Sequence, residues 1–468
     1  LTARPDGGAQ LVCAMPEEYP EEPKSPTPSE RLSRIRRNPV ARDAAVLYLA
    51  HALALLVPLA TIPYLARVLG PHGWGLVVFS QSLGAWLALV IEYGFDLSGT
   101  REIARHRDDH GHVARTVAGV QGAKLLVCSA LVGLIVLLRS VPAFAAEPRL
   151  LWWATAFALA RGVSPAWYFF GVERLRLPAL MESAAKVTAA AGIFLLIREP
   201  GDGWKVLALQ AVTMGTVVLI MTFMMYRRVA LLRPRLNEAV RTLREGVGVF
   251  VFRSASGVYL QANGFILGLL AAPSAVAFFG GAEKIVRAGV NLFQPLSQTL
   301  FPRISHLAVR DNAAAARTLR VGMVIMGAMG LALMITLFMG APFLVNLLLG
   351  PGYDEAVPLV RLLALLPPVI AVGTMFGIQW ALPAGLERPF YLLVVAAGLV
   401  NIAMAFVLVP RLGAFGMGLG VVTAELLVAL GLLVVFRNRS GRFWPLTFPV
   451  QIPEAAMPTD AGSRNVGR

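Results

Sequence analysis

The sequence predicts an all-α integral membrane protein with about twelve transmembrane helices, in two six-helix bundles, and with both chain ends in the cytoplasm. Three observations predict this fold. Hydrophobic residues make up 57% of the 468 residues and charged residues only 15%, whereas soluble domains have about 45–50% and about 25%. Apolar runs of transmembrane length recur along the chain, and basic residues gather in alternate loops between them. An ordinary soluble enzyme is therefore disfavoured.

The apolar runs give the helices in order. A spanning helix needs about 20 mostly apolar residues. Three of the runs, 178–197, 247–270 and 274–300, carry internal charges and are the weakest. No run alternates with the period of two that the strands of an outer-membrane barrel show. The expected spans are 44–66, 74–95, 116–138, 150–170, 178–197, 205–226, 247–270, 274–300, 319–341, 357–381, 388–409 and 413–436.

The basic residues predict the orientation. With the N-terminus inside, the cytoplasmic segments hold 25 arginines close to the spans, from Arg31 to Arg442, and the external loops hold 6 basic residues. This asymmetry follows the positive-inside rule, and an odd number of spans would scramble it. It also accounts for the net charge of +15, so we expect no nucleic-acid partner.

The longest basic loop divides the spans into two sets of six. A faint repeat joins the sets, because Pro71 opens the second span and Pro273 the eighth, with Gln81 and Glu283 ten residues further on. Transporters built from such repeats bind substrate between them, near the bilayer midplane. We expect a flexible cytoplasmic tail 1–42, an N-terminal bundle 43–226, a basic cytoplasmic linker 227–246, a C-terminal bundle 247–437 and a cytoplasmic tail 438–468.

The eighth span carries the clearest polar face. A charge inside a membrane helix costs about 2.5–3.5 kcal/mol on insertion scales, so each one requires an explanation. Steps of four, four, three and four residues place the polar side chains on one side of a helix. We expect this face to line a cavity, and the alternative is a closed Glu283–Arg287 pair. The face comprises Glu283, Arg287, Asn291, Gln294 and Gln298, with Lys284 beside it.

Other spans also carry charges. Glu92 ends the second span and is either an interfacial carboxylate or a protonatable group coupled to ion flow. Arg161 lies near the middle of the fourth span, where its side chain cannot easily reach the interface, and Arg253 lies in the seventh. Glu182 and Lys186 in the fifth span are four residues apart, and we interpret them as a satisfied pair.

Cations outnumber anions in this interior, which favours an anionic substrate. The arginine guanidinium suits planar, bidentate contact with phosphate oxygens. We therefore expect ion coupling at Glu92 and Glu283, and we expect no catalytic residue, metal or cofactor. The expected substrate contacts are Arg161, Arg253, Lys284, Arg287 and Asn291.

Two motifs with catalytic counterparts lie in the loop after the second span. His106-Arg107-Asp108 spells a kinase triplet, but no glycine-rich nucleotide loop precedes it. His106, His110 and His112 with the neighbouring aspartates could bind a metal, but a solvated cytoplasmic loop is the favoured interpretation. No Walker A motif occurs in the chain, and the external loops are too short for a catalytic domain of glycan assembly.

Four segments resemble a known family. They are Thr61–Pro71, Phe79–Ser82, Tyr93–Ala104 and Trp167–Glu173, and they are similar to the O-antigen and exopolysaccharide flippases of the multidrug/oligosaccharidyl-lipid/polysaccharide exporter superfamily. The motifs cover about a quarter of the chain, and the twelve-span layout extends the likeness to the membrane region. Arg67, Arg101 and Glu102 belong to these motifs, where they either contact substrate or shape a turn.

The resemblance implies a function. It implies that a lipid-linked oligosaccharide, carried on undecaprenyl diphosphate, crosses a bacterial inner membrane by alternating access between two bundles, coupled to an ion gradient. The implied partners are this polyprenyl-diphosphate-linked glycan, membrane lipid, and a polysaccharide polymerase with chain-length proteins. The alternatives are a multidrug exporter of the same fold, a membrane enzyme of glycan assembly, and a scaffold without transport activity.

Overall fold

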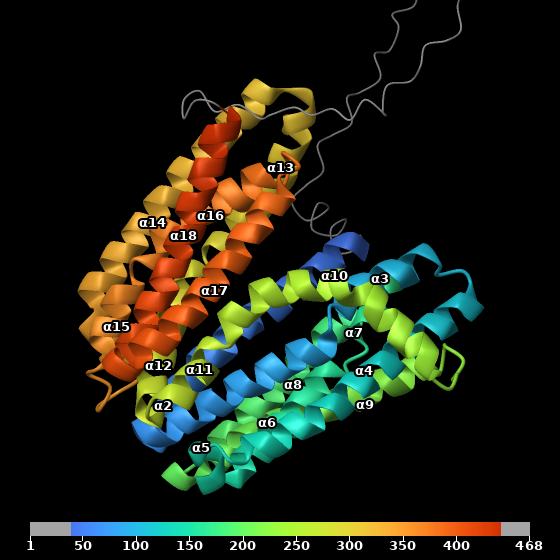
Figure 1. Cartoon of the computed structure of the whole chain (residues 1–468), viewed down its shortest axis with the longest axis horizontal. Helices are drawn as coiled ribbons and strands as arrows, with labels where there is room; N and C mark the ends of the chain where they lie inside the picture. Colours follow the sequence, from blue (N-terminus) through green and yellow to red (C-terminus); the bar gives the residue numbers. More distant parts are fainter. Residues whose placement is uncertain (1–38, 441–468) are drawn as a thin grey trace, which may run out of the picture.

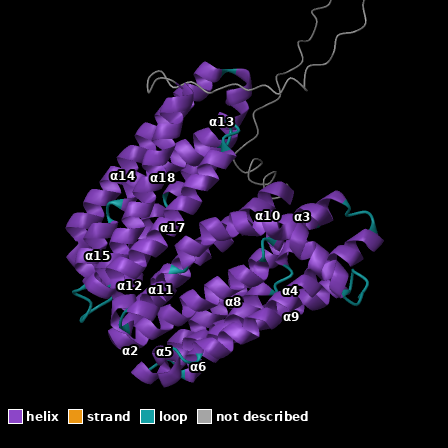
Figure 2. Cartoon of the chain, viewed as in Figure 1, coloured by secondary structure: helices purple, strands orange, loops and turns teal. Residues whose placement is uncertain are grey.

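The computed structural model of the chain describes residues 39–440, together with their side chains except in a few places, chiefly 251–261. Every regular element among these residues is a helix (Figure 2). The fold is therefore all-α, as predicted. The expected tails 1–42 and 438–468 lie almost entirely outside the described residues.

The helices of the first half follow the expected spans closely. Helix α2 contains a kink at Gly70, whose φ of 66° is left-handed, and Pro71 restarts the helix because its ring lacks a backbone N–H donor. The elements are α2 (Pro39–Glu92), α3 (Phe95–Arg105), α4 (His110–Leu138), α5 (Pro142–Ala146), α6 (Pro148–Gly162), α7 (Ala166–Gly171), α8 (Arg176–Leu196), the 3-10 turn η1 (Pro200–Asp202) and α9 (Gly203–Tyr226).

The second half contains shorter, interrupted helices. The expected seventh span is divided between α10 and α11, and the expected eighth between α12 and α13. Helix α10 begins eleven residues before the expected start of its span and packs on α4. The elements are α10 (Leu236–Gln261), α11 (Asn263–Leu270), α12 (Pro273–Val290), α13 (Phe293–Arg310), α14 (Asn312–Leu348), α15 (Ala356–Leu363), α16 (Leu366–Gly373), the π-helix η2 (Thr374–Ala381), α17 (Glu387–Leu412) and α18 (Ala414–Ser440).

Eight helical stretches among the described residues are long and apolar enough to cross a membrane. One of them, Ala52–Arg105, contains most of the first expected span and all of the second, joined across the kink. The expected fourth, seventh and eighth spans are not among the eight, and each of them is interrupted and carries charges. The chain is therefore a multi-pass membrane protein, whereas the count of twelve and the orientation stay predictions.

The helices form two arms that meet at one end and separate at the other (Figure 1). One arm contains α3 to α9, the other contains α13 to α18, and α2, α11 and α12 meet at the closed end. The open end is marked by α3, α10 and α13.

Small residues allow the backbones to approach closely at the closed end. A Cβ atom on Gly75 would lie 1.8 Å from the carbonyl oxygen of Pro273, so α2 and α12 can cross here only with glycine at this position. Tyr353 is 1% exposed and donates a hydrogen bond of 3.0 Å to the carbonyl oxygen of Ala66. Its ring also makes an edge contact with Trp74, with 5.9 Å between the centroids. These contacts tie the loop after α14 to α2.

Two of the family-like motifs meet at the other end of the first arm. Helix α3 packs on α7, where a Cβ atom on Gly99 would lie 2.7 Å from the ring of Trp167. The hydroxyl of Thr100 donates a hydrogen bond of 3.0 Å to the Trp167 carbonyl oxygen. The motifs 93–104 and 167–173 thus form one packed corner of the first arm.

Candidate transport cavity

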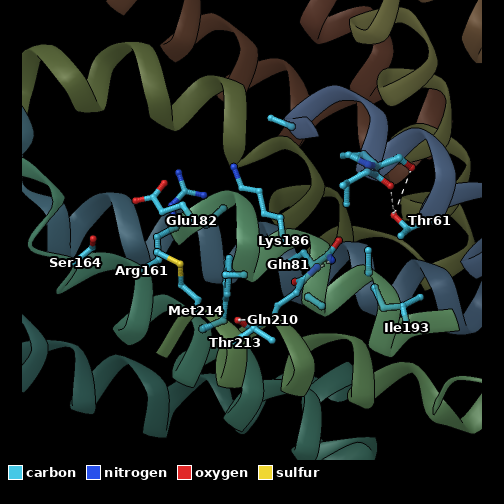
Figure 3. A pocket seen from close by; sticks show the side chains of 18 of the residues that line it. Thr61, Gln81, Arg161, Ser164, Glu182, Lys186, Ile193, Gln210, Thr213 and Met214 are labelled. Atoms are coloured by element: carbon cyan, nitrogen blue, oxygen red, sulfur yellow. Dashed lines mark hydrogen bonds between the residues drawn. The ribbon is translucent and has the colours of Figure 1, made fainter. Parts of the chain in front are cut away.

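A cavity of about 590 Å³ opens along the first arm and is lined by α2, α3, α4, α6, α7, α8 and α9, with one residue from α12 (Figure 3). Its volume lies within the range of about 300–1,000 Å³ that is usual for ligand sites. The wall is mostly apolar and carries a limited set of polar groups. Among these are the uncharged side chains of Thr61, Gln81, Ser164, Gln210 and Thr213.

Charges of both signs reach the cavity. Four cationic and three acidic side chains line it, so the wall carries a small positive excess when all of them are ionised. They lie on six helices, which are α2, α3, α4, α6, α8 and α12. These side chains are Lys124, Arg161, Lys186 and Lys284, with Glu92, Asp96 and Glu182.

Arg161 and Glu92 form the central contact of this wall. Arg161 Nε lies 3.5 Å from Glu92 Oε1, and the two side chains remain 45% and 22% exposed. The contact is long and partly open to solvent, so its Coulomb energy is small. An anionic ligand can therefore approach the guanidinium without first displacing a buried ion pair.

Lys124 is a cavity residue that sequence reasoning missed. It is 2% exposed, and its Nζ donates a hydrogen bond of 3.0 Å to the Ser164 carbonyl oxygen. That carbonyl lies at the break between α6 and α7, where Pro165 interrupts the helix. The signal was present, because a lysine inside the apolar run 116–138 requires a buried partner or a polar cavity.

The fifth-span residues also reach the cavity. Glu182 and Lys186, interpreted from the sequence as a satisfied pair, both lie on the cavity wall with Arg161 (Figure 3). On the neighbouring helix, Gln210 accepts a hydrogen bond of 3.2 Å from Gln81. This amide pair links α2 to α9 at the cavity surface.

The structure separates the residues predicted on the eighth span. Lys284 lines the cavity, and its Nζ lies 5.1 Å from the centre of the Trp74 ring. Glu283 and Arg287 form a two-point contact of 2.8 and 2.9 Å away from the cavity wall. Asn291 follows the end of α12, where its backbone N–H donates to the Arg287 carbonyl oxygen.

The predicted site residues are thus only partly brought together. Arg161 and Lys284, expected at the substrate, share the cavity with Glu92, expected in ion coupling. Arg287, Asn291 and Glu283 are not among the residues that line it. Arg253 lies on α10, and its side chain is outside the described residues.

Comparison with known proteins identifies the family. Residues 40–308 match the sequence profile of the family described as polysaccharide biosynthesis protein, which is more than half of the chain. The chain belongs to this family. The assignment confirms the likeness inferred from the sequence motifs.

Two bacterial relatives align over most of the chain. A protein of Escherichia coli (strain K12) named "Putative O-antigen transporter" is 27% identical over 398 residues, which cover 84% of this chain and 96% of the relative. A protein of Shigella dysenteriae with the same name is 26% identical over 398 residues, 84% of this chain and 98% of the relative.

Solved structures share the fold. A multidrug resistance MATE family transporter of the MOP superfamily, in an inward-facing conformation, superposes with a TM-score of 0.65, at 17% identity, over 81% of this chain and 93% of its own. The lipid II flippase MurJ, in an inward closed conformation, superposes with a TM-score of 0.62, at 12% identity, over 84% of this chain and 87% of its own. Both of these proteins are membrane transporters, and at these identities they show that the chain shares their fold.

Proposed function

We propose that the chain translocates undecaprenyl-diphosphate-linked oligosaccharide units across a bacterial inner membrane by alternating access, driven by an ion gradient. The units would serve the synthesis of O-antigen, capsule or exopolysaccharide. The observation that carries the proposal is the cavity containing Arg161, Lys124, Lys186 and Lys284. The family and the names of its bacterial relatives support a glycan as cargo.

The predicted N-in orientation determines the side of the membrane to which the two arms open. The open end of the two arms is marked by α3, α10 and α13 (Figure 1). The segments 101–115, 227–246 and 303–320, which include the ends of these helices and the turns beside them, hold most of the basic residues expected inside. An N-in orientation would therefore open the arms to the cytoplasm, where a lipid-linked oligosaccharide is assembled. The contacts at Gly75 and Tyr353 would then seal the external side.

The cavity chemistry fits a diphosphate. A diphosphate presents planar arrays of acceptor oxygens, which a guanidinium can bind with two parallel N–H donors. Arg161 and Lys284 reach the cavity from α6 and α12, so one anion between them would bridge the first arm and the helix at the closed end. Arg253, Arg287 and Asn291 remain proposed contacts along the path outside this cavity.

Glu92 is the proposed coupling group. Its carboxylate lies beside Arg161, so protonation of Glu92 would leave the guanidinium without its counter-charge. An anionic substrate would then bind more tightly, which links a proton or cation to substrate occupancy. Glu283 remains a second proposed coupling group, outside the cavity and paired with Arg287.

The acids in the cavity favour one rival function. Glu92, Asp96 and Glu182 line the same wall, and a multidrug exporter of this fold would use such carboxylates to bind an organic cation. The cationic excess argues against this function. A polymerase and chain-length proteins are proposed partners that would consume the translocated glycan.

Reconstituted protein tests the proposal. Purified protein in liposomes is supplied with a fluorescent undecaprenyl-diphosphate-linked saccharide, and its loss from the outer leaflet is followed with a membrane-impermeant quencher. We expect flipping in wild-type vesicles and none in vesicles with equal amounts of the Arg161→Ala/Lys284→Ala variant. Uptake of a fluorescent organic cation without flipping of the lipid would refute the flippase and support the exporter.

A further inference from the structure

Three side chains meet at the corner between α3 and α4, at the open end of the first arm. Glu102, His106 and His112 each offer one ligand atom, and all these atoms lie within 4.8 Å of one another. Glu102 Oε1 lies 2.8 Å from His112 Nε2 and 3.3 Å from His106 Nδ1. We propose that these residues form a binding site for a divalent transition-metal ion, with Zn²⁺ as the ion that fits them best.

Local structure holds the three groups together. Glu102 lies in the last turn of α3, and His106 is the residue that caps its end, four positions further on. His106 Nδ1 lies 3.3 Å from Glu102 Oε1 and 3.2 Å from the Glu102 carbonyl oxygen. Asp109 caps α4 by accepting a hydrogen bond of 2.9 Å from the backbone N–H of His112, which fixes that residue in the first turn. The carboxylate of Asp109 is therefore engaged in the cap, and accepting the cap's N–H donors lowers its pKa.

Contacts to the rest of the arm fix the corner itself. Arg107 Nη1 lies 3.1 Å from Glu173 Oε1, which connects the turn to the segment after α7. The hydrogen bond from Thr100 to the Trp167 carbonyl oxygen holds α3 on α7. The ligand atoms are thus carried by two helices whose mutual placement is set by packing, as a preformed site requires.

The donor set and spacing fit zinc. Imidazole nitrogen and carboxylate oxygen bind Zn²⁺ at about 2.0–2.2 Å, so ligand atoms around a tetrahedral ion are about 3.3–3.6 Å apart. The separations of 2.8 and 3.3 Å around Glu102 Oε1 reach this geometry with small side-chain rotations. The side chains of His106, His112 and Glu102 are 44%, 31% and 39% exposed, so an ion and a water in the fourth position can reach the site.

A bound cation would join the two imidazoles to one carboxylate. The ring centroids of His106 and His112 lie 4.1 Å apart, and one nitrogen of each ring lies within 3.3 Å of Glu102 Oε1. A metal ion accepts both nitrogen lone pairs and the carboxylate together, and would brace α3 against α4. From the sequence alone we expected a solvated loop, since the histidines were grouped there with the neighbouring aspartates and not with Glu102.

Direct metal titration tests the site. Full-length protein with a histidine-free affinity tag is purified in detergent, stripped with a chelator, and titrated with Zn²⁺ against a chromophoric competitor. We expect one equivalent to bind in the wild type, and the affinity to fall at least about tenfold in His106→Gln/His112→Gln and in Glu102→Gln. His110→Gln is the matched control, because His110 lies in the same corner but outside the cluster.

A second measurement separates binding from folding defects. We expect Zn²⁺ to raise the unfolding temperature of wild-type protein and of His110→Gln, but not that of the double histidine variant, whose metal-free unfolding temperature should match wild type. Equal zinc affinity in wild type and the double variant would overturn the site, as would an equal loss of affinity in His110→Gln. Neither measurement depends on transport, so the result is independent of the proposed flippase function.

Discussion

Arg161 on α6 and Glu92 on α2 face one another in the wall of the cavity, with 3.5 Å between Nε and Oε1. Since both side chains remain partly exposed, each can be reached by a ligand or an ion while the other stays in place. An anionic substrate would therefore bind Arg161 while a coupling cation or proton binds Glu92, so both would act on the same contact.

Replacing Arg161 should strongly reduce transport. Loss of a charge-assisted contact costs about 1.5–3 kcal/mol, or about ten- to a hundredfold in affinity. We expect Arg161→Ala to lower surface polymer accordingly in cells that depend on this protein, and Arg161→Lys to retain part of the activity because the charge survives without the planar fork.

The matched control for this variant is Arg149→Ala. Arg149 lies over the Trp204 ring at 5.4 Å, near the closed end and away from the cavity. Surface polymer is quantified by gel after equal membrane levels are verified. Equal polymer in Arg161→Ala and Arg149→Ala would contradict a substrate contact at Arg161.

Replacing Glu92 should separate coupling from binding. In liposomes with an imposed pH gradient, we expect Glu92→Gln to flip substrate at the same rate with and without the gradient, whereas wild type accelerates with it. The neutral amide keeps the size of the side chain but cannot exchange a proton. Glu283→Gln is the comparison, since its carboxylate is paired with Arg287.

A double-mutant cycle distinguishes a coupling role of Glu92 from a role as the counter-charge of Arg161. If Glu92 serves only as its counter-charge, the effects of Glu92→Gln and Arg161→Ala on substrate affinity will be coupled and gradient dependence will persist in Glu92→Gln. Persistence of the gradient response would remove Glu92 from the coupling mechanism.

Much of the fold could be predicted from residues that contact lipid or other helices. The length of the apolar runs follows from the bilayer thickness, and their bounds in sequence and structure agree within a few residues for α8, α9 and α17. The kink at Gly70-Pro71 also has a local cause.

The site was harder to predict because it depends on how distant helices pack. Periodicity placed Glu283, Arg287 and Asn291 on one face, but it cannot tell whether that face meets a cavity. Glu92 and Arg161 were each singled out, yet nothing in the sequence indicated that they touch. Lys124 was missed because a single lysine in a long apolar run has no periodic partner.

Topology mapping should place residues 235 and 352 on opposite sides of the membrane. The reason is the asymmetry of basic loops, together with the structure. Residue 235 directly precedes α10, which marks the open end, and Tyr353 ties the loop after α14 to α2, which meets the other helices at the closed end (Figure 1). Single cysteines at Arg235 and Gly352, in a background without Cys13 and Cys128, are labelled with an impermeant maleimide in intact cells. We expect labelling only at residue 352, and labelling of both or of residue 235 alone would refute the N-in orientation.

Replacing Gly75 should open the closed end. A Cβ atom at this position would lie 1.8 Å from the Pro273 carbonyl oxygen, and both are backbone-bound groups that cannot rotate aside. Gly75→Ala must therefore push α2 and α12 apart, at a cost of about 1–3 kcal/mol for overpacking. That cost changes the ratio of closed to open conformations by about five- to a hundredfold.

The labelling rate of a buried cysteine measures this opening. Leu349 is fully buried at the junction, so in the background without native cysteines we expect Leu349→Cys to react slowly with a maleimide. Gly75→Ala should accelerate the reaction about five- to a hundredfold. Gly133→Ala is the control, since a Cβ atom there meets open space on α4 and alanine only improves the helix. Gly75 belongs to α2, the helix that also carries Glu92. A faster reaction in Gly75→Ala, but not in Gly133→Ala, would show that the packing of α2 controls the closure of this end. Equal labelling rates in the two variants would contradict that role of α2.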